Sequence, residues 1–335
     1  MKGDAILTGG IDILFSTHNG ARTLPRMFSA MQRLRPPKRL WRIIAVDNAS
    51  VDGTRAILNE ASQKLPLEIV HAPLPGKLPA LQLGARKVAG DYVLFTDDDV
   101  EPCPDWLVAY EEAIEADPDA TLLGGPINPI PIEPVSPWFE VSSDHHAALF
   151  AKSEHSGEDV DAIACIYGPN FMLKTAALDA LYQVRAGLGP TFDAKLRNVF
   201  PMGGDTAIVE AIVRNGAKVK YVRNASVLHL VRAYQTDLHH MLARAERHGR
   251  GFSIRLFDQA KQKPNRMRWI ASNLVRYANA KIAEPSRDVA TREVFNKLWE
   301  LHWLLGATKG AMTLGRAALS SAPAPLPQGE IGTPA

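Results

Sequence analysis

The sequence contains very little cysteine, with only Cys103 and Cys165 in 335 residues. Two cysteines at this spacing make neither a metal-binding motif nor a disulfide framework, so we expect a reducing, cytoplasmic compartment. No stretch approaches the roughly 20 consecutive apolar residues of a membrane-spanning helix. The first residues also lack the apolar run of a signal peptide. We therefore expect a cytoplasmic protein, either free or peripheral on the inner face of a membrane.

A strong net charge is also absent, since 38 basic and 36 acidic residues leave a formal charge of +2. The balance hides an asymmetry. From Arg232 to Arg316 the chain carries 16 Lys and Arg against 7 Asp and Glu, which leaves 22 against 29 for the remainder. A basic C-terminal third is expected to face something anionic, such as a membrane surface. The alternative is that it covers the acidic main body of its own or a neighbouring subunit. No nucleic-acid-binding motif accompanies it, so a nucleic-acid partner is not expected.

Short apolar runs alternate with amphipathic segments along the first 100 residues. The runs at 11–15, 41–46, 67–70 and 92–95 predict buried strands, and the segments at 24–34, 54–65 and 78–88 predict helices between them. This alternation predicts an α/β fold with a mainly parallel sheet and helices on both faces. Polar residues at the strand ends would then meet at one edge, where open α/β sheets bind ligands.

The last of these runs ends in three consecutive carboxylates, Asp97, Asp98 and Asp99. On an extended backbone, Asp97 and Asp99 would point to the same side and Asp98 to the other. Like charges this close destabilise a fold unless something neutralises them. Mg²⁺ or Mn²⁺, which binds a few carboxylates together with substrate phosphates, is the natural partner. The alternative is a solvated acidic turn that caps the next helix.

The middle of the chain is less regular. Residues 106–116 predict a helix and 121–125 a strand, whereas the proline-rich stretch 126–137 is expected to lack regular structure. The histidines of 142–157 are expected at the surface or near an acceptor rather than on a metal, because helical ligand pairs are usually four residues apart. They are His145, His146 and His155.

The second half of the chain contains further strand and helix patterns. We expect a strand over 163–173 around a Gly-Pro break, a helix over 203–213 and a strand over 219–230. Asp205 is placed like a helix N-cap, and His229 between apolar residues is by default a hydrogen-bonded core histidine. Beyond Asp237 the pattern is helical, basic and contains three tryptophans, Trp269, Trp299 and Trp303.

Together these residues resemble the family 2 glycosyltransferases, nucleotide-sugar enzymes of the GT-A fold. The resemblance covers about residues 11–232 and rests on seven motifs in order. They are Ser16-Thr17-His18-Asn19, the stretch 46–54, the stretch 89–99, Gly168-Pro169-Asn170-Phe171-Met172, Phe192-Asp193, Gly204-Asp205 and Val227-Leu228-His229. The resemblance implies a GT-A catalytic domain over 1–232. A helical basic region over 233–320 and a disordered tail over 321–335 would follow it.

The resemblance also implies which residues bind the nucleotide. Thr17, Asn19 and Asp47 would line its pocket, with Asp47 accepting a hydrogen bond from the base, for which uracil is a good fit. Asp97 would contact the ribose or a metal-bound water. The implied donor is a nucleoside diphosphate sugar, with a UDP-sugar expected first.

The metal and catalytic roles follow from the same resemblance. Asp99 and His229 would hold the Mg²⁺ or Mn²⁺ that neutralises the leaving diphosphate. Asp205 would be the general base that removes the acceptor hydroxyl proton in a single displacement with inversion. Asn170 and Gly204 would lie in the region of the donor and acceptor sugars.

Two departures from the family pattern stand out. The family usually has Glu-Asp where this chain has Gly204-Asp205, and the second acid, which matters in the family, is retained. The stretch 265–269, Asn-Arg-Met-Arg-Trp, only loosely echoes the Gln-x-x-Arg-Trp motif of processive synthases. Without membrane spans, the chain is expected to transfer one sugar per event to a glycan or lipid-linked acceptor, as in cell-envelope polysaccharide synthesis.

Two other functions compete with this interpretation. A sugar nucleotidyltransferase of similar fold would usually open with a glycine-rich, basic loop after the first strand, and the stretch 18–22, His-Asn-Gly-Ala-Arg, is a poor phosphate cradle. A non-catalytic nucleotide-sugar-binding protein would need Asp205 to be only a helix cap.

Overall fold

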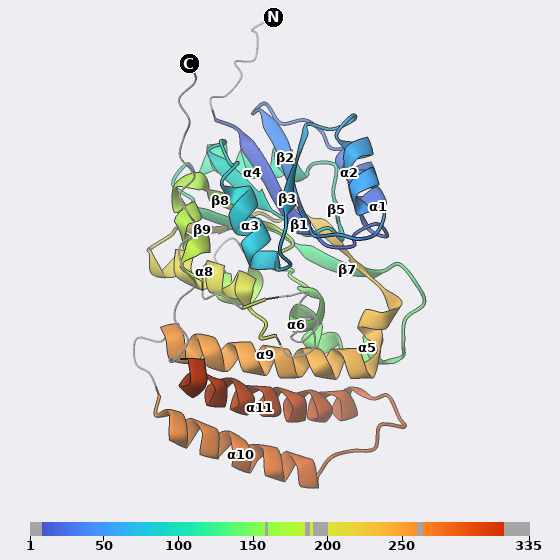
Figure 1. The fold of residues 1–335 in the computed structure, drawn as a ribbon, viewed down its shortest axis with the longest axis vertical. Helices are drawn as coiled ribbons and strands as arrows, with labels where there is room; N and C mark the ends of the chain where they lie inside the picture. Colours follow the sequence, from blue (N-terminus) through green and yellow to red (C-terminus); the bar gives the residue numbers. More distant parts are fainter. Residues whose placement is uncertain (1–8, 158–159, 185–187, 190–199, 260–263, 318–335) are drawn as a thin grey trace, which may run out of the picture.

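The computed structural model describes residues 9–157, 160–184, 188–189, 200–259 and 264–317. The Phe192-Asp193 motif and the C-terminal tail from residue 321 lie outside the described residues. Figure 1 shows the described chain as a sheet domain above a stack of three long helices.

A seven-stranded sheet forms the centre of the upper part, in the order β3-β2-β1-β4-β8-β6-β9. Parallel pairs join β1 to β2, β1 to β4 and β2 to β3, whereas β8 runs antiparallel to β4 and β6. The predicted parallel arrangement of the first four strands is therefore confirmed. The strands are β1 (Ile11–Thr17), β2 (Trp41–Asn48), β3 (Leu67–Ala72), β4 (Tyr92–Phe95), β6 (Leu122–Gly124), β8 (Phe171–Lys174) and β9 (Val219–Tyr221).

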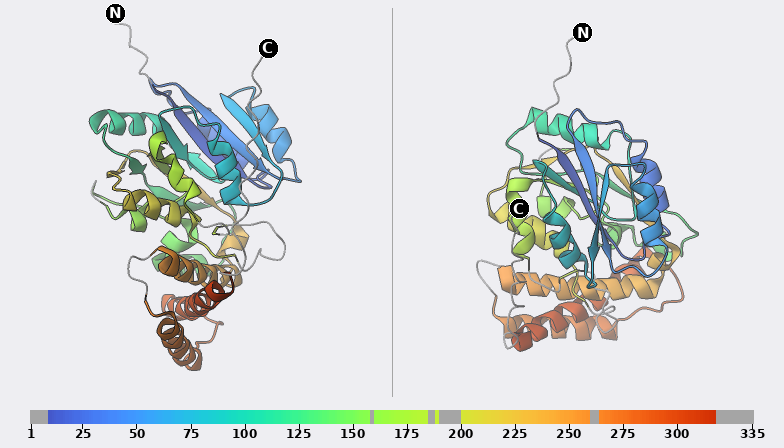
Figure 2. Two further views of the ribbon diagram at one scale, coloured as in Figure 1. Left: turned by 60° about the vertical axis from the view of Figure 1, so that its left-hand side comes forward. Right: turned by 45° about the horizontal axis from the view of Figure 1, so that its top comes forward.

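Helices cover both faces of this sheet because its central strands are apolar on both sides (Figure 2). In β1, Ile13 packs in one hydrophobic cluster with residues of α1 and α4, and Leu14 packs in another with residues of α3 and α8. Successive side chains of a strand point to opposite faces, so one strand contributes to two cores. The helices are α1 (Leu24–Met31), α2 (Thr54–Ala61), α3 (Lys77–Ala85), α4 (Trp106–Ala116) and α8 (Gly204–Arg214).

A second, three-stranded sheet corrects the expectation for the proline-rich stretch. Strand β7 (Ile127–Pro131) pairs in parallel with β10 (Val227–Val231), which pairs antiparallel with β5 (Val100–Pro102). In β7, Pro129 and Pro131 occupy the alternate positions whose amides would face away from β10. An edge strand tolerates proline there because no ladder hydrogen bond is lost.

Two further expectations need correction. The predicted strand over 163–173 is instead a short helix, α7 (Ala162–Cys165), followed by β8; the Asp161 carboxylate accepts from the Ile163 amide and starts that helix. The predicted strand over 219–230 is two strands, β9 and β10, which belong to different sheets. The turn between them lets the chain leave the large sheet for the small one.

Short helical segments fill the region between the two sheets and the long helices. They are α5 (Trp138–Val141), η1 (Ser143–His145), α6 (His146–Phe150) and η3 (Ala233–Thr236). Another short segment, η2 (Thr175–Tyr182), packs instead with α3 and α8 against the large sheet. His145 stacks on Trp299 with ring centroids 4.5 Å apart, and buried His146 contacts the Phe139 carbonyl oxygen through Nε2 at 2.9 Å. Both histidines therefore pack within the protein.

The three C-terminal helices confirm the predicted helical region. They are α9 (Leu238–Gln259), α10 (Arg266–Ile282) and α11 (Arg292–Ala317), and α11 lies between the other two in Figures 1 and 2. Glycines let α9 and α11 approach closely: a Cβ on Gly249 would lie 2.0 Å from the Trp303 carbonyl oxygen, and one on Gly306 1.9 Å from that of Glu246. Within the described chain, no helix is apolar over a length that could cross a membrane.

Candidate active site

Most of the predicted site residues meet where β1, β4, β10 and α8 converge. Thr17 is the last residue of β1, and the three aspartates follow β4 directly. His229 lies in the middle of β10, and Asp205 in the first turn of α8. Parallel strands place their carboxyl ends at one edge, so residues far apart in sequence come together there.

The three aspartates form a turn rather than an extended strand end, which corrects the expected alternation. Asp97 Oδ1 lies 2.6 Å from Lys77 Nζ, Asp98 Oδ2 accepts a 2.5 Å hydrogen bond from Thr17 Oγ1, and Asp99 Oδ1 lies 3.4 Å from His229 Nε2. Each carboxylate therefore has its own partner from a different part of the chain.

Crowding of the aspartates changes their acidity. Burial, followed by the neighbouring Asp99 charge, raises the pKa of Asp98 to about 7, although the hydrogen bond from Thr17 opposes this. Burial also raises the pKa of Asp97, against the opposing effect of Lys77. Asp99 differs: burial acts to raise its pKa, but His229 more than compensates and the pKa is lowered. Asp99 is therefore the member of the turn best suited to stay ionised beside a cation.

Asp99 and His229 fit a divalent cation. His229 is buried, and its Nδ1 lies 2.6 Å from the Phe150 carbonyl oxygen, where it can only donate. That hydrogen bond leaves Nε2 facing Asp99 Oδ1 at 3.4 Å, and in the neutral ring this nitrogen could bind a metal, the arrangement found at most histidine metal ligands. Among the described residues, no group of three or more His, Cys, Asp or Glu side chains is arranged so that it could hold a metal ion by itself. Substrate oxygens and water would thus complete the coordination, as Mg²⁺ and Mn²⁺ commonly require.

Lys77 is a central residue that the sequence analysis missed. Its ammonium lies 2.6 Å from Asp97 Oδ1 and 3.7 Å from Asp205 Oδ2, and its side chain is only 18% exposed. Burial acts to lower the pKa of Lys77, but Asp205 and Asp97 outweigh it and the pKa is raised. A signal was present in the sequence. Lys77 follows Gly76 at the start of the helix after the third predicted strand, which places it at the same sheet edge.

Asp205 is accessible and is not the N-cap that the sequence suggested. The N-cap position belongs to Gly203, with φ 104°, and Asp205 is the second residue of α8. Its side chain is 36% exposed. A Cβ on Gly168 would lie 2.3 Å from Asp205 Oδ2, so only glycine leaves room for the carboxylate there. The Gly168-Pro169-Asn170 motif thus shapes the space around Asp205.

Asp47 and Asn19 join the loops that follow β2 and β1. Asp47 is fully buried; Oδ1 accepts from the Ser50 amide at 3.0 Å and Oδ2 lies 2.7 Å from Arg55 Nε. Burial acts to raise the Asp47 pKa, but hydrogen bonds from Ser50 and Arg55 outweigh it and the pKa is lowered. Asn19, with φ 55°, accepts from the Val51 amide through its side chain. These contacts give the predicted base pocket a fixed wall.

Asn170 and Gly204, predicted near the sugars, have packing roles in this structure. The Asn170 side chain is buried, accepts from Trp106 and Tyr110 at 2.9 Å each, and donates to the carbonyl oxygens of Pro126 and Ala225. Its side chain therefore has no hydrogen-bonding capacity left over, while its placement in the sugar region stays a prediction. Gly204 packs tightly, since a Cβ there would lie 3.1 Å from the Leu188 carbonyl oxygen.

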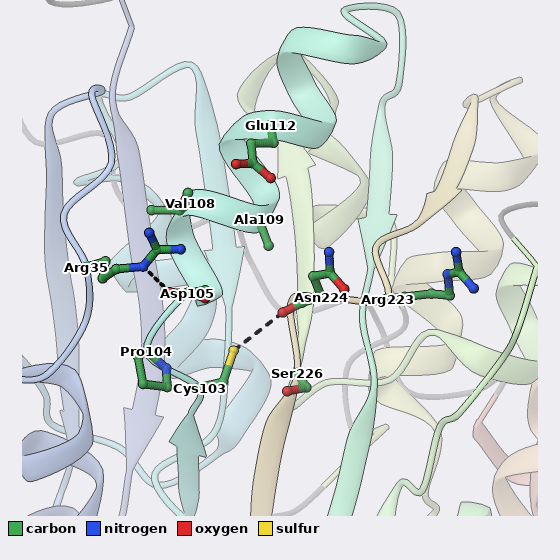
Figure 3. A pocket seen from close by; sticks show the side chains of 10 residues that line it. All are labelled: Arg35, Cys103, Pro104, Asp105, Val108, Ala109, Glu112, Arg223, Asn224 and Ser226. Atoms are coloured by element: carbon green, nitrogen blue, oxygen red, sulfur yellow. Dashed lines mark hydrogen bonds and ion pairs between the residues drawn. The ribbon is translucent and has the colours of Figure 1, made fainter.

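A hollow of about 480 Å³ opens beside the start of α4 (Figure 3). It is lined by Arg35, Cys103, Asp105, Glu112, Arg223 and Asn224 among others. Arg35 pairs with Asp105 across it, and Cys103 Sγ donates to the Asn224 carbonyl oxygen. It contains none of the predicted site residues, so we place the candidate active site at the aspartate turn instead.

Comparison with known proteins supports this fold. The PcManGT mannosyltransferase of Pyrobaculum calidifontis, solved with GDP-Man and Mn²⁺, superposes with a TM-score of 0.52 at 17% identity, covering 94% of this chain and 77% of that one. S. aureus TarS 1–349, solved with UDP-GlcNAc, gives a TM-score of 0.51 at 13% identity, covering 92% of each chain. Both have the GT-A fold, to which the present sheet and helix arrangement corresponds.

Sequence comparison points the same way. Glycosyltransferase AglE of Haloferax volcanii is 27% identical over 99 residues, which are 29% of this chain and 33% of the relative's length. The match thus spans only about a third of that relative. The family model for glycosyl transferase family 2 matches residues 12–181, which are 170 of the 335 residues. The chain therefore belongs to glycosyl transferase family 2.

Proposed function

We propose that the protein transfers a single sugar from a nucleoside diphosphate sugar to an acceptor hydroxyl, with metal assistance and inversion of configuration. The observation that carries the proposal is the aspartate turn. It connects the Asp99–His229 pair, which would bind a cation, to the accessible carboxylate of Asp205. The connection runs through Lys77 and Asp97. Such a cluster provides charge for a leaving diphosphate and, separately, a base for a nucleophile.

Each residue of the cluster then has a distinct task. Asp205 accepts the proton of the acceptor hydroxyl as its oxygen attacks the anomeric carbon. Asp99 and His229 would hold a divalent cation, which would supply Lewis acidity for the departing nucleoside diphosphate. Lys77 adds a fixed positive charge to the same region and offsets the repulsion between the Asp97 and Asp205 carboxylates. The acceptor oxygen bonds to the anomeric carbon on the face opposite the bond to the leaving diphosphate, which breaks in the same step. No covalent sugar–enzyme intermediate is therefore needed.

UDP is the nucleotide that we propose first. The two structural neighbours were solved with GDP-Man and with UDP-GlcNAc, so the fold accommodates both bases. In this chain Asp47 is buried near the end of β2, with a lowered pKa that keeps it an acceptor at neutral pH. An ionised carboxylate suits the N–H of uracil. The proposed pocket is completed by Thr17 and Asn19.

The alternatives are weaker on specific grounds. The loop after β1 presents a histidine ring bound to the Asn48 carbonyl oxygen rather than a row of free amides, so it makes a poor phosphate cradle for a nucleotidyltransferase. A purely binding role would leave Asp205 as a helix cap, but Gly203 occupies that position.

A donor screen tests the proposal. The full chain is heated with UDP, GDP and ADP, each with and without Mn²⁺, because a ligand that binds only the folded state raises the melting temperature. We expect one nucleoside diphosphate to give a Mn²⁺-dependent shift. The corresponding sugar nucleotides are then supplied with simple glycoside acceptors, and NMR of the product reads its anomeric configuration. A retained configuration, or no Mn²⁺-dependent shift with any nucleotide, would contradict the proposal.

We further propose that helix α10 docks on an anionic membrane surface, where a lipid-linked acceptor would be presented. The helix is the outermost layer of the C-terminal stack (Figures 1 and 2) and contains four basic residues but no acidic one. Its large apolar residues Met267, Val275 and Ile282 are 70%, 61% and 86% exposed. Cations beside exposed apolar side chains are typical of helices that lie in a membrane interface.

Vesicle co-sedimentation measures this docking. Wild type is expected to bind vesicles that contain phosphatidylglycerol more tightly than neutral ones. The double variant Arg266→Glu/Arg268→Glu should bind them at least about 30-fold more weakly, at about 1 kcal/mol per basic residue. Lys64→Glu, a charge reversal on the exposed surface of the sheet domain, serves as the matched control. Equal binding to neutral and anionic vesicles would remove this part of the proposal.

A further inference from the structure

Three arginines near the aspartate turn have no carboxylate partner. Arg232 follows β10, and Arg244 and Arg247 lie one turn apart on α9. Arg232 lies 4.9 Å from the Tyr234 ring centroid and Arg247 4.8 Å from that of Phe200, while Arg244 Nε donates to the Ala148 carbonyl oxygen at 3.2 Å. Among the described residues none of these guanidinium groups forms an ion pair, unlike most other arginines of the structure.

Two of the three side chains, those of Arg232 and Arg247, also contain an unsatisfied nitrogen. Arg247 is only 8% exposed, and the Nε atoms of Arg232 and Arg247 are buried without a hydrogen-bond partner in the described structure. Burying a charged donor without a partner is costly, so such groups normally face an anion. Burial and then the Arg247 charge lower the pKa of Arg244 to about 10. Burial and then the Arg244 charge lower the pKa of His240 to about 4.

The arginines lie near the candidate active site. Arg232 interacts electrostatically with Asp98 and Asp99, and Arg244 with Asp99 and Asp97. Helix α6 links Arg244 to the Asp99–His229 pair. Its Ala148 carbonyl oxygen accepts a hydrogen bond from Arg244, and its Phe150 carbonyl oxygen contacts His229. The Arg247 carbonyl oxygen accepts from the Met202 amide, three residues before Asp205.

We propose that Arg232, Arg244 and Arg247 form a phosphate-binding wall beside the Asp99–His229 pair. Guanidinium groups bind phosphate oxygens in a bidentate manner, and three of them without carboxylate partners supply the charge that such an anion needs. The phosphate has two possible sources: the diphosphate of the donor, or a phosphate carried by the acceptor. The assignment of these sources rests on the proposed glycosyl transfer, whereas phosphate binding by the three arginines does not.

Calorimetric titration of the full chain tests the wall. The first arm titrates UDP, or GDP, in the presence of Mn²⁺. The second arm titrates inorganic phosphate, once onto the free protein and once onto protein saturated with nucleotide and Mn²⁺. The variants are Arg244→Gln, Arg247→Gln and, at a half-buried position less critical for folding, Arg232→Gln. Arg250→Gln is the matched control, because Arg250 lies on the same helix but is paired with Glu246.

Each variant is expected to weaken phosphate or nucleotide binding by about 10- to 100-fold, the usual effect of losing a charge-assisted hydrogen bond. The control should stay within about threefold of wild type. Weakening in the first arm identifies the donor diphosphate as the ligand. If the variants weaken only the binding of inorganic phosphate to protein already saturated with nucleotide and Mn²⁺, the ligand is an acceptor phosphate.

Two results would overturn the wall: wild-type affinities in all three folded variants, or no phosphate binding by wild type in either arm. In both cases the guanidinium groups only balance the aspartate charges. Failure of the proposed donor reaction looks different. The wild type would then bind inorganic phosphate in an arginine-dependent manner without binding any nucleotide with Mn²⁺.

Discussion

Asp205→Asn is expected to lower kcat by about 10²- to 10⁴-fold, the usual contribution of a general base. Asparagine has nearly the same shape, so the space bounded by Gly168 stays filled, but its amide cannot take the acceptor proton. Lys77 keeps its closer partner Asp97, at 2.6 Å, so the local structure should persist. Donor affinity should therefore change by no more than a few fold.

The measurement is the rate of nucleoside diphosphate release with saturating donor and acceptor, next to calorimetric donor affinity. Asp117→Asn is a suitable control, because Asp117 is also paired with a lysine, Lys218, but lies outside the aspartate cluster. A variant that keeps more than a tenth of the wild-type kcat would show that another group is the base. Equal losses in donor affinity and kcat would instead mean that Asp205 has a structural role.

Asp99→Ala is expected to abolish the Mn²⁺-dependent rise in melting temperature produced by a nucleoside diphosphate. Losing even a supporting residue of a metal site costs 10- to 100-fold in affinity, so the loss of a direct ligand should exceed about 100-fold. His229 would keep its hydrogen bond to Phe150 but lose its partner at 3.4 Å. Transfer activity should fall in parallel with the loss of cation binding.

Thermal shift with increasing Mn²⁺ at fixed nucleotide measures this effect, and His229→Gln should reduce it in the same direction. Asp119→Ala, which removes an exposed carboxylate after α4, should behave as wild type. Full retention of the Mn²⁺-dependent shift in Asp99→Ala would place the cation elsewhere. A shift that depends on nucleotide but not on Mn²⁺ in the wild type would mean that Lys77 and the arginines alone neutralise the diphosphate.

Much of the fold follows from local patterns in the sequence. Apolar runs of four to eight residues, separated by helical spacing and by turns rich in Asn, Asp and Gly, specify the first four strands and the helices between them. The acidic turn after β4 was equally visible, because it directly follows a buried run. Since these signals lie within about ten residues of one another, no tertiary information is needed to recognise them.

The proline-rich strand β7 shows where such local reasoning fails. Proline usually excludes a regular strand, yet here the alternate prolines face the open edge of a small sheet. That arrangement depends on β10, which lies about 100 residues further along the chain. Neither the pairing nor the free edge can be read from residues 126–137.

Only the tertiary structure decided how the site is assembled. In the folded chain each aspartate has a different partner, and Lys77 lies between Asp97 and Asp205. Asn170 is hydrogen-bonded within the core, and α9 brings its arginines near the Asp99–His229 pair. These contacts join residues separated by 20 to 130 positions. Charge interactions depend on distance in space and on burial, and a chain fixes neither until it is folded. The sequence by itself therefore determined the family and the run of three aspartates, while folding determined their turn and which charges meet there.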